Sequence, residues 1–286
     1  MDNDELRNEI HNFIDENLVD GDPLVVEAAR YVSLASGHRW RPLITLRTVE
    51  AFNGDLFTAM PLAVAGEYAH LATVIDDDLP CMDNQDLRKG KLTCHKQFGE
   101  DIAVLVQLYL IGKLIRLDTG VNLSDNKVRK ILGVRGQTIN YLVSGQKKDL
   151  RDLKNINDLE QVIEVYRLKT GSLMGSASVI GGIACGAGEE YLKSLDNFGN
   201  FKGVAYQIRD DVYDVMPGEL SLGKSKGQDH GKNTLIRLLG VDEAIGIADR
   251  YDEMALEELR KIDGLDTKGL EELVIEMRDS DQNVYN

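Results

Sequence analysis

Residues 76–83 read DDDLPCMD, and a second acidic stretch, DDVYD, follows at residues 210–214. Each comes at the end of a segment that has the composition of a helix, residues 62–75 for the first and 198–209 for the second. Asp210 and Asp214 are four residues apart, so they share one face of a helix. Hard oxygen ligands at this density suit Mg²⁺, which binds through a few carboxylates together with substrate phosphates.

A single acidic cluster is more often a solvated surface or a helix cap than a metal site. Two features favour the metal site here. Both clusters end a helical segment, and the first is followed within a few residues by Arg88 and Lys89. Two such clusters facing each other would hold one polyphosphate through metal ions.

The spacing inside the first cluster needs a bend in the chain. Asp77 and Asp83 are six residues apart and would not share a face of a straight helix. Pro80 ends or kinks a helix, because it lacks a backbone N–H and clashes with the preceding turn. We therefore expect a bulge at Pro80 that returns Asp83 to the side of Asp77.

The composition predicts an all-α fold. The 286 residues include 43% hydrophobic residues but only five prolines, and the intervening stretches are rich in helix-forming residues. No hairpin dipeptide stands between alternating segments. Residues 163–185, rich in Gly, Ala and Ser, predict a central buried helix, and the apolar residues 102–115 predict a core or dimer helix. We expect one domain over residues 1–286.

The charge balance excludes several partners. The formal net charge of −15 argues against nucleic acid and anionic membrane surfaces. No apolar run is long enough to span a bilayer. The three cysteines, Cys81, Cys94 and Cys185, form neither a disulfide framework nor a zinc pattern. The acidic start MDNDE is unlike a signal peptide, so we expect a cytoplasmic protein.

The two acidic motifs and their neighbours resemble those of the trans-isoprenyl diphosphate synthases, the family of farnesyl and geranylgeranyl diphosphate synthases. The matching blocks, in chain order, are GHRWRP at 37–42, the acidic stretch at 77–83, Arg88-Lys89-Gly90, GQKKDL at 145–150, Lys169-Thr170, Gln207 and the acidic stretch at 210–214. The resemblance runs from about Gly37 to Thr234. It implies a single-domain helical bundle around a central cavity, of the isoprenoid synthase type, and a homodimer.

The same resemblance assigns the site residues. About three Mg²⁺ ions, with Mn²⁺ as an alternative, would be held by carboxylates and would offset the negative charge of the substrates. The implied metal-binding residues are Asp77, Asp78, Asp83, Asp210, Asp211 and Asp214. The implied residues for isopentenyl diphosphate are His38, Arg41, His70 and Lys89, and those for the allylic diphosphate are Arg88, Lys169, Lys224 and Lys232.

Leaving diphosphate creates an allylic cation, which the oxygens of Thr170 and Gln207, with Lys169 beside them, can stabilise in a dry cavity. We therefore name as catalytic Asp77, Asp78, Asp83, Lys169, Thr170, Gln207 and Asp210. No side chain is an obvious base, so the departed diphosphate is expected to accept the proton.

The chain departs from the family pattern in several places. His38 stands where lysine is usual, Lys89 replaces the second arginine of a pair, and Asp76 stands where histidine is common. Residues 106–109 lack the usual Gly-Asp, and the loop at 227–232 is about two residues short. Because unperturbed histidine has a pKa of about 6.5, we expect affinity for isopentenyl diphosphate to weaken between about pH 6 and pH 8.

We expect a prenyltransferase that condenses isopentenyl diphosphate with dimethylallyl, geranyl or farnesyl diphosphate. Family members that stop at fifteen carbons often have an aromatic residue one turn before the first acidic motif, where this chain has the small residues Ala72 and Thr73. The resemblance therefore implies a channel open past fifteen carbons, with Tyr109 a candidate for its floor. This favours geranylgeranyl diphosphate as the product. The alternatives are a farnesyl diphosphate synthase, a class I terpene cyclase and a non-catalytic regulatory subunit of a prenyltransferase.

Overall fold

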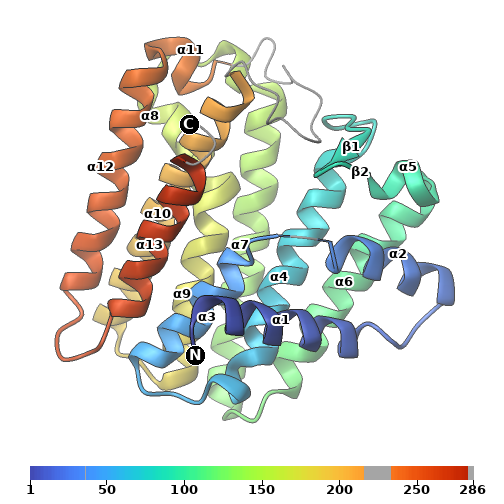
Figure 1. Ribbon diagram of the computed structural model, residues 1–286, viewed down its shortest axis with the longest axis vertical. Helices are drawn as coiled ribbons and strands as arrows, with labels where there is room; N and C mark the ends of the chain where they lie inside the picture. The colour runs from blue at the N-terminus through green and yellow to red at the C-terminus, as the bar shows by residue number, and fades with distance from the viewer. Residues whose placement is uncertain (36, 216–232, 283–286) are drawn as a thin grey trace. The chain divides into compact units, whose positions relative to one another are not determined.

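Helices carry most of the chain in the computed structural model (Figure 1). The structure describes residues 1–35, 37–215 and 233–282, and for residues 281 and 282 it describes the backbone alone. The helices are α1 (Asn3–Asn17), α2 (Pro23–Ser33), α3 (Trp40–Ala51), α4 (Leu56–Asp78), α5 (Cys94–Phe98), α6 (Glu100–Gly120), α7 (Asp125–Arg151), η1 (Leu153–Asn155), α8 (Leu159–Tyr166), η2 (Arg167–Gly171), α9 (Ser172–Cys185), α10 (Glu189–Val215), α11 (Leu235–Leu239), α12 (Val241–Arg260) and α13 (Lys268–Gln282). The all-α prediction is confirmed.

The contacts within the chain group the described residues into two compact units. The first contains residues 1–43 and 57–122, and the second contains residues 44–56, 123–215 and 233–282. That residues 1–286 form a single domain stays a prediction.

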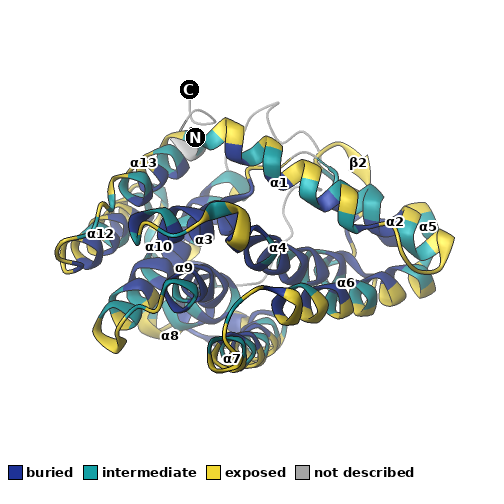
Figure 2. Cartoon of the chain, turned by 90° about the horizontal axis from the view of Figure 1, so that it is seen from below, coloured by how far each residue is buried: buried dark blue, intermediate teal, exposed yellow. Residues whose placement is uncertain are grey.

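In the first unit, α1 begins with two reciprocal hydrogen bonds between Asp2 and Glu5, which lie one helical turn apart. The backbone N–H of Glu5 donates to the Asp2 carboxylate at 2.8 Å, and that of Asp2 donates to the Glu5 carboxylate at 2.9 Å. Leu6, Ile10 and Ile14 follow at intervals of four and are fully buried, whereas the opposite face of α1 is exposed (Figure 2). The helix is therefore fixed to the unit along one face.

Helix α4 starts earlier than its sequence predicts. The segment with helical composition begins at residue 62, but the helix begins at Leu56 and contains Pro61 in its second turn. Proline there leaves out one backbone hydrogen bond. Its surroundings outweigh that loss, because α4 is apolar on most of its circumference and buries residues such as Leu62 and Tyr68 completely.

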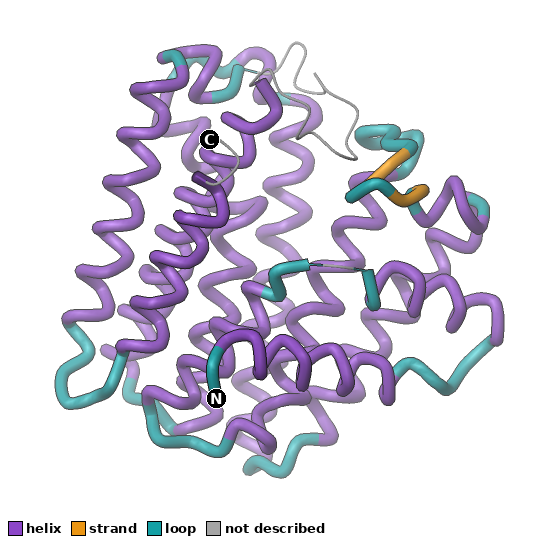
Figure 3. The backbone as a smooth tube through the Cα atoms, viewed as in Figure 1, coloured by secondary structure: helices purple, strands orange, loops and turns teal. Residues whose placement is uncertain are grey.

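A small hairpin follows α4, contrary to the expectation that no hairpin is present. Strand β1 (Leu87–Arg88) pairs antiparallel with β2 (Lys91–Leu92), drawn in orange in Figure 3. Its turn residues, Lys89 and Gly90, both have positive φ angles, 51° and 75°. Two left-handed residues in a two-residue loop are typical of the turn that matches the twist of paired strands.

In the second unit, α9 and η2 approach α10 without side chains between them. A β-carbon at Gly203 would lie 2.4 Å from the Cα of Gly171, and one at Gly199 would lie 2.5 Å from the Cα of Gly175. The expected central buried helix is confirmed, since α9 is buried over most of its length. It is not one uninterrupted α-helix over 163–185, because η2 is a π-helical turn between α8 and α9.

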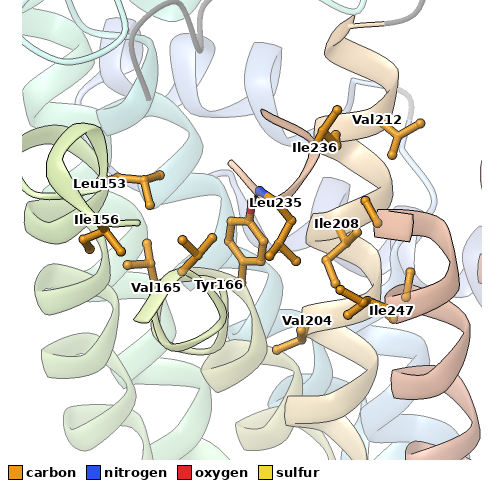
Figure 4. Packing of buried hydrophobic residues seen from close by; sticks show 14 residues of the cluster. Leu153, Ile156, Val165, Tyr166, Val204, Ile208, Val212, Leu235, Ile236 and Ile247 are labelled. Carbon is orange, nitrogen blue, oxygen red and sulfur yellow. Dashed lines mark hydrogen bonds between the residues drawn. The ribbon is translucent and has the colours of Figure 1, made fainter. Parts of the chain in front are cut away.

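Aliphatic side chains from α8, α10, α11 and α12 form a core in this second unit (Figure 4). Val165, Ile208 and Leu235 belong to it and are at most 1% exposed. Tyr166 is the polar member of the group, and its ring lies beside Leu235 in the close-up. The core thus holds together the helices that carry Lys169, Thr170 and the second acidic motif.

Candidate active site

The loop after α4 folds back onto the end of that helix. The backbone N–H of Asp83 donates to the carbonyl of Asp77 at 2.9 Å, and that of Gln85 donates to the carbonyl of Asp78 at 3.1 Å. Asn84 takes a left-handed conformation, with φ at 50°. The expected return of Asp83 to Asp77 is therefore confirmed for the backbone, which brings both residues of the acidic motif to one place.

The Asp78 carboxylate is held by Arg88 from the hairpin. The Nε and a terminal nitrogen of Arg88 lie 3.0 Å and 2.7 Å from its oxygens, and the Asp78 side chain is 5% exposed. A two-pronged arginine–carboxylate contact fixes both partners. Asp78 consequently links the end of α4 to the hairpin that carries Lys89.

His70 lies on α4 among positive charges. Burial, together with the charges of Arg41, Arg88, Lys89 and Arg39, holds the pKa of His70 well below its usual range. Its imidazole is therefore neutral at ordinary pH, and it can donate or accept a hydrogen bond without adding charge. Cations gathered in this way from residues 39–41 and from the hairpin make a site for an anion with several charges.

Arg39 and Arg41 differ in their surroundings, although they flank the same tryptophan. A terminal nitrogen of Arg39 lies 2.7 Å from Glu67, and the other donates to the backbone carbonyl of Ser33 at 2.6 Å. Both ends of the Arg39–Glu67 pair are about 6% exposed. Arg39 thus anchors the turn to α2 and α4, while Arg41 is one of the charges that face His70.

His38 packs on Trp40. The two rings are parallel, with centroids 4.9 Å apart, and His38 is exposed while Trp40 is buried. A β-carbon at Gly37 would lie 3.1 Å from the Nζ of Lys89, so the motif at 37–42 and the hairpin meet. Of the residues expected to bind isopentenyl diphosphate, the structure thus brings His70, Arg41 and Lys89 together and sets His38 on the adjoining turn.

Sequence reasoning missed Arg7 at this turn. Its Nε donates to the carbonyl of His38 at 3.0 Å, and its guanidinium carbon lies 5.2 Å from the centroid of the Trp40 ring. Thirty-one residues separate Arg7 from His38. A contact at such a distance in sequence leaves no periodic signal that could have pointed to it.

In the second unit, Lys169 and Thr170 lie in the π-helical turn η2. The Lys169 ammonium donates to the Asp149 carboxylate at 2.9 Å. A β-carbon at Gly145 would lie 2.6 Å from the backbone nitrogen of Lys169, so α7 passes directly against the turn. Extra residues in a single π-turn are frequent at functional sites, where they re-aim side chains.

A chain of hydrogen bonds fixes the oxygens of Thr170 and Gln207. The Thr170 hydroxyl donates to the Gln207 carbonyl at 2.6 Å, and the Gln207 amide donates to one Asp211 oxygen at 3.0 Å. The Tyr166 hydroxyl donates to the other Asp211 oxygen and accepts from the backbone N–H of Leu235 at 3.2 Å. Since its amide nitrogen serves Asp211, Gln207 keeps its carbonyl oxygen toward Thr170.

The remaining predicted residues lie on α10 or outside the described chain. Asp210 and Asp214 are both partly exposed and one helical turn apart on α10, as expected. Lys224, Lys232 and the loop at 227–232 lie outside the described residues. Within residues 1–35, 37–215 and 233–282, no three His, Cys, Asp or Glu side chains are already gathered as a metal site.

This donor set nevertheless fits Mg²⁺. The candidate ligands are all carboxylates, and Mg²⁺ takes one or two of these with water and substrate phosphate in place of a full protein cage. In the first unit the folded-back loop carries Asp77 and Asp83, and in the second unit α10 carries Asp210. Asp78 and Asp211 differ from these, because Arg88 holds the first and Tyr166 and Gln207 hold the second.

Comparisons with known proteins agree with this architecture. The family model for polyprenyl synthetase matches residues 22–273. A relative from Arabidopsis thaliana named putative geranylgeranyl pyrophosphate synthase 8, chloroplastic, is 39% identical over 249 residues, which cover 83% of this chain and 69% of that protein.

Two solved structures show the same fold. The crystal structure of a geranylgeranyl pyrophosphate synthase has a TM-score of 0.88 at 22% identity and covers 96% of this chain and 97% of its own. A geranyltransferase from Helicobacter pylori, complexed with magnesium and isoprenyl diphosphate, has a TM-score of 0.85 at 25% identity and covers 96% of this chain and 95% of its own.

The fold is that of the solved structures, and the family match together with the relative makes the protein an all-α trans-prenyltransferase. Among the described residues, no helix is both long and apolar enough to cross a bilayer. The chain belongs to the polyprenyl synthetase family.

Proposed function

We propose that the protein condenses isopentenyl diphosphate with an allylic diphosphate and releases geranylgeranyl diphosphate. The observation that carries the proposal is the group of cations around neutral His70, in the same unit as the folded-back acidic loop. A site with Arg41, Arg88 and Lys89 around one uncharged hydrogen-bonding group suits a diphosphate. The names of the relatives support the choice of product.

The first unit would bind the homoallylic substrate. Arg41, Lys89 and His38 would contact the diphosphate of isopentenyl diphosphate, and His70 would donate a hydrogen bond to it. Arginine suits this role because its planar fork matches two phosphate oxygens. Arg88 would serve the allylic diphosphate while its contact with Asp78 keeps it in place.

The second unit would stabilise the allylic cation formed when diphosphate leaves. The Thr170 proton points toward Gln207, so the lone pairs of the Thr170 oxygen remain available to a positive carbon. The Gln207 carbonyl has a second lone pair with the same use. Dipoles that are already oriented stabilise a developing charge without the cost of reorganisation.

Lys169 would bind the allylic diphosphate, and Asp149 would hold its ammonium ready for that contact. The alkene of isopentenyl diphosphate then attacks the cation, and the condensed intermediate loses a proton to the departed diphosphate. Asp77 and Asp83 in the first unit, and Asp210 in the second, would each hold Mg²⁺, which would supply positive charge to the leaving group. The matching structure complexed with magnesium and isoprenyl diphosphate supports this cofactor.

We further propose that the protein is a homodimer through α6. Val104, Leu105, Leu108 and Ile115 of this helix are 46–67% exposed. Large apolar side chains that gather on one exposed helix are typical of an association surface.

The position of Tyr109 bears on product length. Its hydroxyl donates to the carbonyl of Asp20 at 2.8 Å, and its ring lies 3.1 Å from where a β-carbon of Gly21 would be. Tyr109 is therefore held by the loop between α1 and α2. Ala72, small and buried on α4, is the residue that we propose leaves room for a chain longer than fifteen carbons.

The test is incubation of the full chain with Mg²⁺, isopentenyl diphosphate and allylic diphosphates of five, ten and fifteen carbons, followed by product chromatography. A twenty-carbon product supports the proposal, and a product that stops at fifteen carbons identifies a farnesyl diphosphate synthase. Allylic substrate consumed without isopentenyl diphosphate would indicate a cyclase. Turnover of neither substrate would indicate a regulatory subunit.

A further inference from the structure

The turn at residues 37–40 has a backbone that needs support from outside. Arg39 has a φ of 56°, in the left-handed region that residues other than glycine adopt at a cost in free energy. Such conformations persist where the surroundings fix them, and they are frequent in ligand sites. The support for this turn therefore decides how His38 is presented.

The inner side of the turn is held by Arg39 itself. Its guanidinium binds Glu67 of α4 and the backbone carbonyls of Ser33 and Ala35 at the end of α2. These contacts fix the Arg39 side chain inside the unit. They do not reach the His38 carbonyl or the His38 ring, which need a second support.

The outer side is held by Arg7 of α1. Its Nε donates to the His38 carbonyl at 3.0 Å, and its guanidinium packs on Trp40, 5.2 Å from the ring centroid. The imidazole of His38 is parallel to the same indole, 4.9 Å away. Arg7 thus restrains the backbone of His38 directly and its ring through Trp40.

Arg7 is itself delivered by a fixed helix. Leu6, next to it in the chain, and Ile10, one turn later, are fully buried. The Arg7 side chain is 20% exposed, and it also pairs at 2.8 Å with Asp4, whose side chain is 88% exposed. The exposed ion pair with Asp4 contributes little to stability, so we expect the contacts of Arg7 with His38 and Trp40 to be the ones that hold the turn.

We infer that Arg7 is a positioning residue for the homoallylic diphosphate. It holds the 37–40 turn so that His38 faces the anion bound by Lys89, whose ammonium already lies against Gly37. The inference rests on the proposed function, since it concerns affinity for one of the two substrates. Through Arg7, helix α1 takes part in the binding of isopentenyl diphosphate. None of the expected site residues lies on α1.

The test compares Arg7→Met with Asp4→Asn. Methionine keeps the length and the helix preference of the side chain but removes the donor and the charge. We expect Arg7→Met to raise KM for isopentenyl diphosphate roughly tenfold, the effect of one lost hydrogen bond to a charged donor. KM for the allylic diphosphate and kcat should stay within about twofold. Asp4→Asn removes only the exposed pair and should behave as wild type.

A second readout does not depend on turnover. Trp40 is the only tryptophan of the chain, so its emission reports on the stack without a label. Arg7→Met should change this emission in the substrate-free protein, and titration with isopentenyl diphosphate should show the weaker affinity. Arg7→Lys keeps the charge but loses the Nε contact, so its affinity for isopentenyl diphosphate should lie between those of wild type and Arg7→Met. It replaces Arg7→Met in the test if that variant folds poorly.

An equal rise in both KM values of Arg7→Met, or an unchanged KM for isopentenyl diphosphate, would overturn the inference. A merely structural role of Arg7 would affect the affinity for both substrates equally or for neither. Failure of the proposed function gives a different result. A wild type that condenses nothing would refute the function, and the Trp40 titration would still decide about Arg7. Equal affinity of wild type and Arg7→Met in that titration would refute the role given to Arg7.

Discussion

The hydroxyl of Tyr166 donates a hydrogen bond to the carboxylate of Asp211, inside the aliphatic core of the second unit. The same oxygen accepts from the backbone N–H of Leu235, and the other Asp211 oxygen accepts from Gln207. Because both oxygens of Asp211 accept hydrogen bonds, its carboxylate is held in one orientation. The orientation of the Gln207 amide, and with it the dipole that we propose it offers to an allylic cation, depends on this buried contact.

Tyr166→Phe should therefore reduce both stability and turnover. The substitution leaves one Asp211 oxygen and the Leu235 N–H without their partner, which costs about 1–3 kcal/mol of unfolding free energy. We expect kcat to fall roughly tenfold, about 1.4 kcal/mol of barrier, because Gln207 is less firmly held. Tyr191→Phe is the control, since Tyr191 donates to a backbone carbonyl at the surface. Equal kcat values in the two variants would contradict the role of Tyr166.

Asp210→Asn should abolish most activity and leave the fold intact. It keeps the shape of the side chain but removes a carboxylate that we assign to Mg²⁺, so turnover should fall on the order of 10³-fold. The fold should persist because one charge fewer on this face of α10 lowers the repulsion with Asp214. Glu189→Gln, an exposed change on the same helix, is the control. Activity within about tenfold of wild type would refute the assignment.

His70 should make the protein less stable in acid. The folded state holds the pKa of His70 well below its usual range, whereas the unfolded chain titrates near the ordinary value of about 6.5. Below that pH the unfolded state binds a proton that the folded state does not, so the unfolding free energy decreases as pH falls. The loss is at most about 1.4 kcal/mol per pH unit until the folded pKa is reached.

His70→Gln should remove this term, so its melting temperature should drop less than that of wild type between about pH 7 and pH 5. His11→Gln, at an exposed position of α1, should follow wild type and serves as the control. Parallel stability curves for wild type and His70→Gln would show that burial and the surrounding cations do not lower the pKa of His70.

Leu108→Lys should break the proposed homodimer. Leu108 is 67% exposed on α6, and a lysine there would place a charge in an apolar interface. Light scattering at micromolar concentration should give about twice 31.8 kDa for wild type and the single-chain mass for the variant. Ile275→Lys, 45% exposed on α13, should remain dimeric. A wild type that is monomeric would exclude the dimer.

The sequence predicts local features of this fold well and long-range ones poorly. Helices such as α6 and α10 follow from the composition and apolar spacing of their segments, and the return of Asp83 to Asp77 follows from Pro80, because these signals lie within a few residues. The support of His38 by Arg7 has no such signal, since side chains that meet across thirty residues obey no period.

The missed local features have separate causes. The hairpin at Lys89-Gly90 has strands of two residues, too short to show alternation. The start of α4 at Leu56 is missed because proline favours the first turn of a helix, whereas Pro61 lies in the second turn, where burial of α4 outweighs that preference. The π-turn at Lys169 is set by its tight contact with Gly145, which composition cannot reveal.

The glycine contacts between η2, α9 and α10 limit how this protein can vary in evolution. Because Gly171 touches Gly203 and Gly175 touches Gly199, backbone to backbone, no side-chain layer exists there that could be exchanged for a larger or smaller one. Even a methyl group would separate the turn that carries Thr170 from the helix that carries Gln207. Substitution of any of these four glycines by a larger residue would therefore change the distance between Thr170 and Gln207, whereas substitutions on α4, in the first unit, leave this backbone contact as it is.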